Sequence, residues 1–548
     1  MRKLFAGAGV VLGVLLASPL ANATGSSAPD FGKLVEGLLN VFSIQQFGFV
    51  KPLESSSLAD LPRRPQQPVS ELLDVAKGLR ADIFSREIAQ NADQFAFWPS
   101  DAAATHIIAC IEVFAPQVIG AFPNGTTKLT PGVQRIDLET RQVETIIRGT
   151  AGCDGIRLTP WGTILFTEED GSPTGDGHLG NAFEILDPLA TTNVTIGRGP
   201  TRGQFFDSTG RTLTGAEAAA PVAAGGFGVA IRQALMEMAW EGIAITPQGV
   251  LIAGDELRPG TRTSATVGGP DADGGALFKF VPDVPAVPGV VLADLTQSPF
   301  AAGRSFAMRV TCSAGNSQYG QGCQKGNAVW VQIDPLSARG EADRVGATGF
   351  YRPEDLVADP NYTGPGLRFC FTNTGDAGAL NFGEVLCAVD TDPLLVTTTL
   401  VADLSGSMVT ADALVDMQVF LEGDDTLTQP DNIDIQARTG NVYVIEDNPN
   451  GDIFACLPDG ADRNVTTDGC VLLATLKDRT AEPTGFGFNA RGDTAYFFIQ
   501  HSADDNNPLT RSNACPNPAA LPEFVRDDFC TDDMIRITGF KLPGKARQ

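Results

Sequence analysis

The residues best suited to do chemistry in this 548-residue sequence are acids that recur at the ends of similar segments. Each segment has an acidic or Cys-Asp start, a short strand-like run, a Pro/Gly turn, a second run, and a polar or acidic end. Six copies occur, at 93–112, 155–170 (preceded by Cys153-Asp154), 241–256, 354–376, 431–448 and 482–501. Because the strands of a hairpin run in opposite directions, the start of the first and the end of the second lie together.

If the hairpins form a ring, their acidic ends converge at one mouth of a central channel. The converging residues are Glu112, Cys153, Asp154, Glu168, Glu169, Glu241, Asp255, Glu256, Glu354, Asp431, Glu446, Asp447 and Glu482. So many carboxylates repel one another unless cations neutralise them, and oxygen-rich clusters suit hard ions such as Ca²⁺. A thiolate among them would favour a softer or redox-capable metal beside the calcium. The pattern predicts a metal cluster, although any single acid could be a solvated turn residue.

The composition excludes some partners. Asp and Glu number 65 against 39 Lys and Arg, for a formal charge of −26, which argues against binding to nucleic acid or to an anionic membrane. Only three histidines occur, so a histidine-built zinc site or a Ser-His-Asp triad is disfavoured. We expect a small-molecule partner, no nucleic acid, no membrane and a monomeric chain.

The elements that would position these acids are strands. From about residue 93, short alternating runs are separated by Gly, Pro, Asn and Asp, which is typical of an all-β fold. Six hairpins with further strands between them predict a six-bladed β-propeller over 93–548. Residues 24–92 are predicted to be a helical extension packed on the main body. Apolar residues fall there at helical spacing from Phe31 to Phe42 and from Leu72 to Ile83.

The first residues predict export. Arg2 and Lys3 precede an apolar run from Leu4 to Ala17, and the small residues of Ala21-Asn22-Ala23 suit a signal peptidase. A membrane anchor is less favoured because roughly 20 apolar residues are needed to span a bilayer. Residues 1–23 are therefore predicted to be a Sec-type signal peptide, and the mature protein to be periplasmic or extracellular.

Export gives the ten cysteines a meaning. Local pairing is the simplest disulfide pattern in an oxidising compartment. It predicts bonds within four pairs: Cys312 with Cys323, Cys370 with Cys387, Cys456 with Cys470, and Cys515 with Cys530. Cys110 and Cys153 remain, either as a fifth disulfide or with a thiolate available to a metal.

Several of these segments also carry a family resemblance. RGTAGCDGIRLTPWGTILFTEED (148–170) resembles the cysteine, TPWGT and double-glutamate motif of the PhoX-type alkaline phosphatases. Further segments similar to that family follow in the same order: RVGATGFYRPEDL (344–356), QPDNIDIQARTGNVYVIED (429–447) and EPTGFGFNARGDTAYFFIQH (482–501). NADQFAFWPS with the later IIACIE resembles the family's opening blade. The resemblance runs from about 91 to 502.

The resemblance implies a six-bladed propeller that holds iron (Fe³⁺) and calcium (Ca²⁺) and hydrolyses phosphate monoesters. Cys153 matches the metal-binding cysteine, Glu241 and Glu354 match glutamate ligands, and Arg352 matches the arginine that grips phosphate. Further candidate ligands fall in matching motifs: Glu112, Glu168, Glu169, Asp431, Asn432, Asp447 and Glu482. The match at Cys153, together with the surrounding carboxylates, favours a thiolate there over a bond to Cys110.

Within the matching segments, the sequence departs from the family pattern at three points. Asp154 and its successors replace glycines, Trp240 replaces a histidine, and Cys110-Ile111 replaces an asparagine-histidine pair. These departures keep an alternative open, a non-catalytic exported binding or structural propeller stabilised by calcium. A lactonase on a similar propeller is disfavoured because Arg352 and a thiolate would have no role in it. Iron with calcium would indicate the phosphatase, and calcium alone the binding module.

Overall fold

The computed structural model describes most of the chain: residues 31–61, 67–116, 118–122, 124–171, 179–259, 274–312, 325–395, 399–402, 408–411, 415–447, 451–458, 469–500 and 531–541. The predicted signal peptide at 1–23 lies outside these residues. Cys323, Cys515 and Cys530 also lie outside them. The predicted Cys312–Cys323 and Cys515–Cys530 disulfides are therefore outside the described part of the chain.

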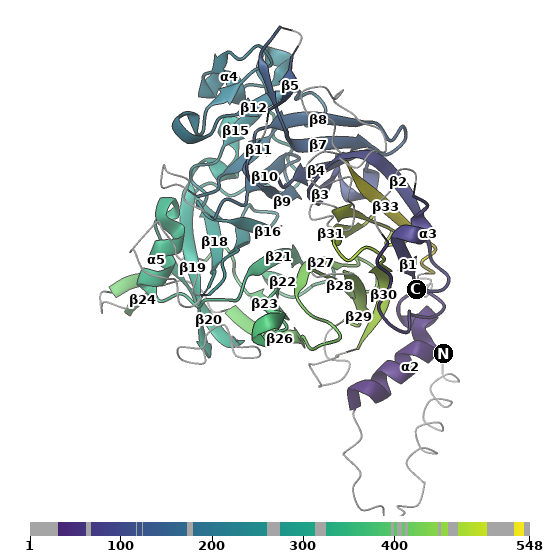
Figure 1. Ribbon diagram of the computed structural model, residues 1–548. Helices are drawn as coiled ribbons and strands as arrows, with labels where there is room; N and C mark the ends of the chain where they lie inside the picture. The colour runs from purple at the N-terminus through teal and green to yellow at the C-terminus, as the bar shows by residue number, and fades with distance from the viewer. Residues whose placement is uncertain are drawn as a thin grey trace, which may run out of the picture.

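Six antiparallel hairpins lie at the six segments with acidic ends (Figure 1). They are β3 (Ala92–Trp98) with β4 (His106–Ile111), β9 (Cys153–Leu158) with β10 (Ile164–Glu168), β16 (Trp240–Ile245) with β17 (Leu251–Asp255), β21 (Pro353–Ala358) with β22 (Leu367–Asn373), β27 (Pro430–Ile435) with β28 (Val442–Glu446), and β31 (Glu482–Phe488) with β32 (Thr494–Gln500). The first strand of each hairpin contacts the first strand of the next, and β31 contacts β3. The first strands therefore close a ring.

Further strands extend the first two hairpins outward. The sheet of β3 and β4 continues through β7 (Pro131–Asp137), β8 (Val143–Arg148), β12 (Val194–Ile196), β13 (Phe205–Phe206) and β14 (Thr212–Leu213). The sheet of β9 and β10 continues through β11 (Ala182–Ile185) and β15 (Val229–Ile231), and α4 (Gly215–Ala219) contacts β15. A separate ribbon pairs β5 (Val118–Ala121) with β6 (Thr127–Leu129).

The third and fourth hairpins share one sheet. From β17 it runs through β18 (Leu277–Pro282), β19 (Gly303–Cys312) and β20 (Lys325–Ile333), and from β22 through β23 (Glu384–Asp390) and β26 (Val415–Glu422). The two parts join where β20 pairs with β26, beside β24 (Thr399–Ala402) and β25 (Met408–Ala411). A buried ion pair links them, with Lys279 Nζ 3.2 Å from Asp390 Oδ2. Helix α5 (Ala338–Val345) follows β20.

The N-terminal strands complete the last two sheets. Beside β27 and β28 lie β29 (Asp452–Cys456), β30 (Cys470–Leu476) and β1 (Leu73–Val75). Beside β31 and β32 lie β33 (Thr531–Thr538) and β2 (Arg80–Ala89). A strand from the start of the described chain thus closes the sheet formed by its end, as the purple β2 beside the yellow β33 shows in Figure 1.

The predicted helical extension is correct only in its first part. Helix α2 (Phe31–Gln46) confirms the first predicted helix, and α3 (Val69–Leu72) is a single turn. The helix predicted over Leu72 to Ile83 is wrong, because these residues enter β1 and β2. Pairing with β33 from Arg80 to Ala89 supplies hydrogen bonds to a sheet edge that would otherwise be open, and such tertiary pairing overrides a weak helical preference.

Apolar side chains fill the spaces between neighbouring sheets. Phe166 and Phe183 stack with their ring centroids 5.2 Å apart in the cluster between the sheets of the first two hairpins. The predominantly β architecture predicted from the alternating runs is confirmed. No helix among the described residues combines the length and apolar character needed to cross a membrane.

Candidate functional site

A β-bulge near the start of the first strand aims the acids in five of the six hairpins. In each of these five, two residues of the first strand face one residue of the second, and the first of the two is acidic: Asp93, Asp154, Glu241, Glu354 and Asp431. A bulge bends its strand and redirects the side chain, and bulges are frequent beside active sites. In the sixth hairpin the bulge lies later, and Glu482 pairs with Gln500 instead.

Glycines allow the bulged strands to approach closely. A Cβ at Gly155 would lie 2.2 Å from the carbonyl oxygen of Glu241, and one at Gly242 would lie 1.7 Å from the backbone nitrogen of Leu356. Such distances exclude any larger residue directly after Asp154 or Glu241. The sequence Asp/Glu-Gly in β9 and β16 therefore brings acids of neighbouring hairpins together.

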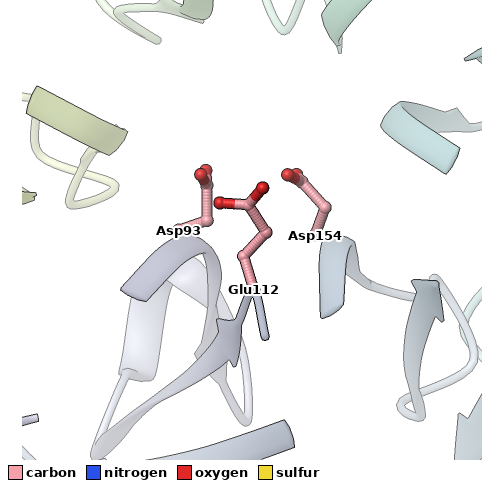
Figure 2. A group of neighbouring side chains, drawn as sticks. All are labelled: Asp93, Glu112 and Asp154. Atoms are coloured by element: carbon pink, nitrogen blue, oxygen red, sulfur yellow. The ribbon is translucent and has the colours of Figure 1, made fainter. Parts of the chain in front are cut away.

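Two overlapping groups of carboxylates result. Asp93, Glu112 and Asp154 each offer an oxygen within 4.8 Å of the others, and Figure 2 shows the three side chains converging. Asp154, Glu169 and Glu241 form the second group by the same criterion. Asp154 is common to both.

Neighbouring amides orient the first group. Gln94 Nε2 donates to Asp154 Oδ1 at 2.9 Å, and Gln500 Nε2 donates to Glu112 Oε2 at 3.0 Å. Asp93 Oδ1 is buried and has no hydrogen-bond partner. A buried acceptor without a partner is costly, so this oxygen is ready for a bound ion.

Burial raises the pKa values of these carboxyls, and the charges of neighbouring acids raise them further. The effect holds the pKa of Asp93, Asp154 and Glu241 well above the usual range, and that of Glu112 at about 7. Burial and then the charge of Glu256 act in the same direction on the pKa of Glu169. A cation would displace these protons, because carboxylate ligands bind metals in their ionised form.

Arg352 lies next to the second group, because its partner Glu256 also interacts with Glu169. It lies just before β21 with φ +59°, a backbone conformation that few non-glycine residues adopt. Its Nε donates to Glu256 Oε1 at 2.6 Å, its Nη2 lies 2.8 Å from Glu354 Oε1, and both Nη atoms donate to Asp447 Oδ2 at 3.2 Å. A buried arginine thus links three hairpins. Burial would raise the pKa of Glu256, but the Arg352 charge outweighs it and lowers that pKa to about 2.

Successive acids at the hairpin ends divide into two kinds. Three hairpins end in such a pair: Glu168–Glu169, Asp255–Glu256 and Glu446–Asp447. The first acid of each pair accepts a hydrogen bond from a backbone N–H just before its own hairpin. Ala151 donates to Glu168 at 3.0 Å, Ala239 to Asp255 at 2.9 Å, and Thr428 to Glu446 at 2.6 Å. The second acid belongs to the carboxylate groups or contacts Arg352. Successive strand residues point to opposite faces, which explains the division.

The structure places the predicted ligands in different surroundings. The oxygens of Glu168 accept hydrogen bonds from Ala151 and Asn181, so the structure does not bring Glu168 into either carboxylate group. Asn432 Oδ1 accepts from the Gly485 N–H at 2.7 Å and thereby ties β27 to β31. Glu112, Glu169 and Glu241 do lie in the groups.

The remaining predicted ligands lie around Arg352. Glu354 and Asp447 contact it directly. Burial, followed by the charges of Asp447 and Glu482, raises the pKa of Asp431 well above its usual range. Burial and Asp447 do the same to the pKa of Glu482.

The predicted thiolate at Cys153 is wrong. Cys153 forms a disulfide with Cys110, with the two Cα atoms 4.9 Å apart, because β4 and the start of β9 lie side by side. A disulfide sulfur is not the thiolate that binds iron. A cysteine-ligated iron therefore does not fit the residues present, whereas hard cations with oxygen ligands do.

Two of the predicted local disulfides are present. Cys370 bonds Cys387, and Cys456 bonds Cys470, each across two paired strands.

The sequence pattern does not predict two of the acids in these groups, Asp93 and Asp154, as ligands. Asp93 was not placed at the mouth, although it begins its segment as Glu241 and Glu354 begin theirs, and that register could have identified it. Asp154 was placed at the mouth but not among the ligands. Its bulge makes it equivalent to the other four acids.

A comparison with known families matches the part of the chain that contains Arg352. A family model described as alkaline phosphatase PhoX matches residues 260–503. The predicted resemblance to the PhoX family is confirmed. The matched, PhoX-like region contains the last three hairpins, and with them Arg352 and Glu354.

Solved structures resemble the fold over most of the chain. Pseudomonas fluorescens PhoX in complex with vanadate, a transition-state analogue, is 13% identical, with a TM-score of 0.50, and the match covers 88% of this chain and 98% of that chain. A gluconolactonase from Xanthomonas campestris is 11% identical, with a TM-score of 0.34 and coverage of 89% and 99%. No curated protein matches the sequence.

Proposed function

We propose that this protein is an exported, metal-dependent phosphatase that hydrolyses phosphate monoesters at the mouth of a six-bladed propeller. The observation that carries the proposal is the PhoX-like region around Arg352, a buried arginine beside a mouth rich in carboxylates. The vanadate bound to the Pseudomonas protein, a transition-state analogue there, supports phosphoryl chemistry on this fold. The closed ring of six hairpins supports the blade count, and the disulfides support export to an oxidising compartment.

Phosphoryl transfer depends mainly on positioning and on neutralising charge. The planar guanidinium of Arg352 can donate to two phosphoryl oxygens at once. Asp447 shares a single oxygen between both Nη atoms at 3.2 Å, the longest contacts of this guanidinium, so a phosphate group would displace Asp447. Glu256, at 2.6 Å from Nε, would keep the side chain in place.

Divalent cations bound by the carboxylate groups would neutralise phosphoryl charge and activate water. The donor set supports calcium, because all its atoms are oxygens. Without cations the mouth would repel an anionic ester, because it holds many acids. The charge of Arg352 does not offset them, since this arginine is already paired with three carboxylates. The substrate class is therefore a small phosphate monoester that enters a cation-loaded mouth of a monomeric protein.

A second candidate is a non-catalytic binding propeller stabilised by calcium. The full pairing of Arg352 with carboxylates and the Cys110–Cys153 bond favour it. Its difference from the first candidate lies in turnover, since both bind calcium.

Hydrolysis of p-nitrophenyl phosphate by purified, calcium-loaded protein separates the two. We expect turnover that vanadate inhibits, and a fall in kcat/KM of about 100-fold in Arg352→Lys, which keeps the charge but loses the two-pronged donor. Arg344→Lys on the exposed side of α5 is the matched control and should retain wild-type rates. Absence of turnover in folded, calcium-loaded protein would favour the binding propeller.

A further inference from the structure

We propose that Asp154 bridges two adjacent sites for hard divalent cations, one completed by Asp93 and Glu112 and the other by Glu169 and Glu241. The inference deepens the proposed function by naming ligands, and its cation sites can be tested without any substrate. It starts from the geometry of the two carboxylate groups, in each of which the ligand oxygens lie within 4.8 Å of one another. Asp154 has two oxygens and belongs to both groups, so one carboxylate can serve two ions.

An independent observation points to a ligand in the first group. Asp93 is 7% exposed, and its Oδ1 has no hydrogen-bond partner. Figure 2 shows this side chain turned toward Glu112 and Asp154. Folded proteins seldom leave a buried acceptor unsatisfied, and a cation between the three carboxylates would satisfy it.

The side chains around Asp154 hold it in place. Gln94 Nε2 donates to its Oδ1, and Gln94 Oε1 in turn accepts from Arg157 Nη1 at 2.8 Å. Arg157 Nη2 is anchored on Asp355 at 2.6 Å. Outer contacts of this kind fix the orientation of metal ligands and are characteristic of built sites.

The donor atoms determine the kind of ion. The disulfide removes the sulfur of Cys153, so the donors that converge on the two sites are carboxylate oxygens. Hard ions such as Ca²⁺ prefer such donors and tolerate irregular geometry, whereas thiolate would have favoured softer metals. Asp154, redirected by its bulge, therefore takes the place of the cysteine ligand implied by the family resemblance.

The test compares calcium stoichiometry in variants, using calorimetric titration of chelator-treated protein and elemental analysis after dialysis. A bridging ligand predicts that Asp154→Asn loses two ions per chain relative to wild type, whereas Asp93→Asn and Glu241→Gln each lose one. Asp416→Asn, on the exposed side of β26, removes the same charge and should lose none. A loss of no more than one ion in folded Asp154→Asn would overturn the bridge.

A second readout covers the case in which Asp154→Asn does not fold. Manganese-loaded wild-type protein should give the spin-coupled paramagnetic resonance spectrum of an ion pair, because ions sharing a carboxylate lie about 4 Å apart. Asp93→Asn and Glu241→Gln should each give the spectrum of an isolated ion. An uncoupled wild-type spectrum, or an iron–sulfur contribution in the X-ray absorption of iron-loaded protein, would refute the proposal. Failure to hydrolyse phosphate would leave these outcomes unchanged and would bear only on the proposed function.

Discussion

The two halves of the mouth handle buried acids in different ways. In the half formed by the last three hairpins, Arg352 contacts Glu354 and Asp447, and it also reaches Glu256 at the end of the third hairpin. In the half formed by the first three hairpins, none of the ion pairs of the described residues brings an arginine or lysine to the two carboxylate groups. The pKa of Glu256 beside the arginine is lowered to about 2, and that of Glu112 is raised to about 7. At Glu354, burial outweighs the arginine and raises the pKa well above its usual range.

Under the proposed function, the half around Arg352 would receive an anion and the half with the two carboxylate groups would receive cations. The arginine keeps the Glu256 carboxylate ionised and would offer donors to a phosphate. The two carboxylate groups define the all-acid half, where bound ions would replace protons. The family model covers the last three hairpins and the strands β18 to β20 that precede them, whereas the first three hairpins lie outside it. This agrees with the finding that the departures from the family pattern, Cys110-Ile111, Asp154 and Trp240, all lie in the all-acid half.

Removal of metal should have the largest effect. Treatment with a calcium chelator should abolish phosphatase turnover and lower the melting temperature, and added Ca²⁺ should restore both. Ions that bind only the folded state stabilise it by about 2.7 kcal/mol at a hundredfold excess over Kd. Calorimetry and the phosphomonoester assay measure the two effects. An unchanged melting curve in excess chelator would show that the all-acid half holds no ions.

A buried ion pair between helix α5 and strand β17 should be the next most sensitive feature. Arg339 Nη2 lies 2.5 Å from Asp255 Oδ1, and both side chains are buried. Arg339→Met leaves that carboxylate without its cation and should lower the free energy of unfolding by about 3–5 kcal/mol. Asp154→Asn in metal-free protein should not lower it, because it removes an acid from a group of repelling acids. Urea denaturation compares the two, and equal losses would erase the distinction between paired and unpaired acids.

The pH dependence of stability contributed by Glu112 should have the opposite sign to that contributed by Glu256. Glu112 has a pKa of about 7 in the fold against its ordinary value of 4.5, so metal-free protein binds more protons when folded. Its contribution is complete below about pH 4.5 and is lost as the pH rises through 7. Glu256, with a pKa of about 2, contributes above 4.5 and loses this contribution as the pH falls toward 2.

Metal-free denaturation curves between pH 4.5 and 8 measure the first effect. Glu112→Gln cannot titrate, so its stability should decline less steeply with rising pH than that of the wild type. Asp434, a half-buried acid of β27 whose pKa is raised to about 7 by desolvation, contributes a slope that this variant keeps. Saturating Ca²⁺ should oppose the decline, because its ligands bind best when ionised. A slope unchanged by the substitution would contradict the pKa of Glu112.

The hairpins and many of the acids at their ends could be predicted from the sequence. The six repeated segments coincide with the six hairpins, because acids and turn residues at fixed offsets are local signals. The strand β2 was mistaken for a helix because its partner β33 lies about 450 residues away, and such pairing has no local signal. The partner of Cys153 depended likewise on how β4 and β9 meet in space.

The smallest predicted effect concerns two successive acids whose side chains lie on opposite faces. Their substitution should change calcium affinity differently. Glu168 and Glu169 are neighbours, both buried, yet Glu168 accepts hydrogen bonds from Ala151 and Asn181 while Glu169 belongs to a carboxylate group. Glu169→Gln should weaken calcium binding about tenfold, which corresponds to about 1.4 kcal/mol. Glu168→Gln removes the same charge one residue earlier and should change the affinity less than about twofold, while lowering stability by about 1–3 kcal/mol through its lost hydrogen bonds. Calorimetric titration of both variants provides the test. Equal effects on affinity would mean that net charge, rather than the face on which each acid lies, determines cation binding.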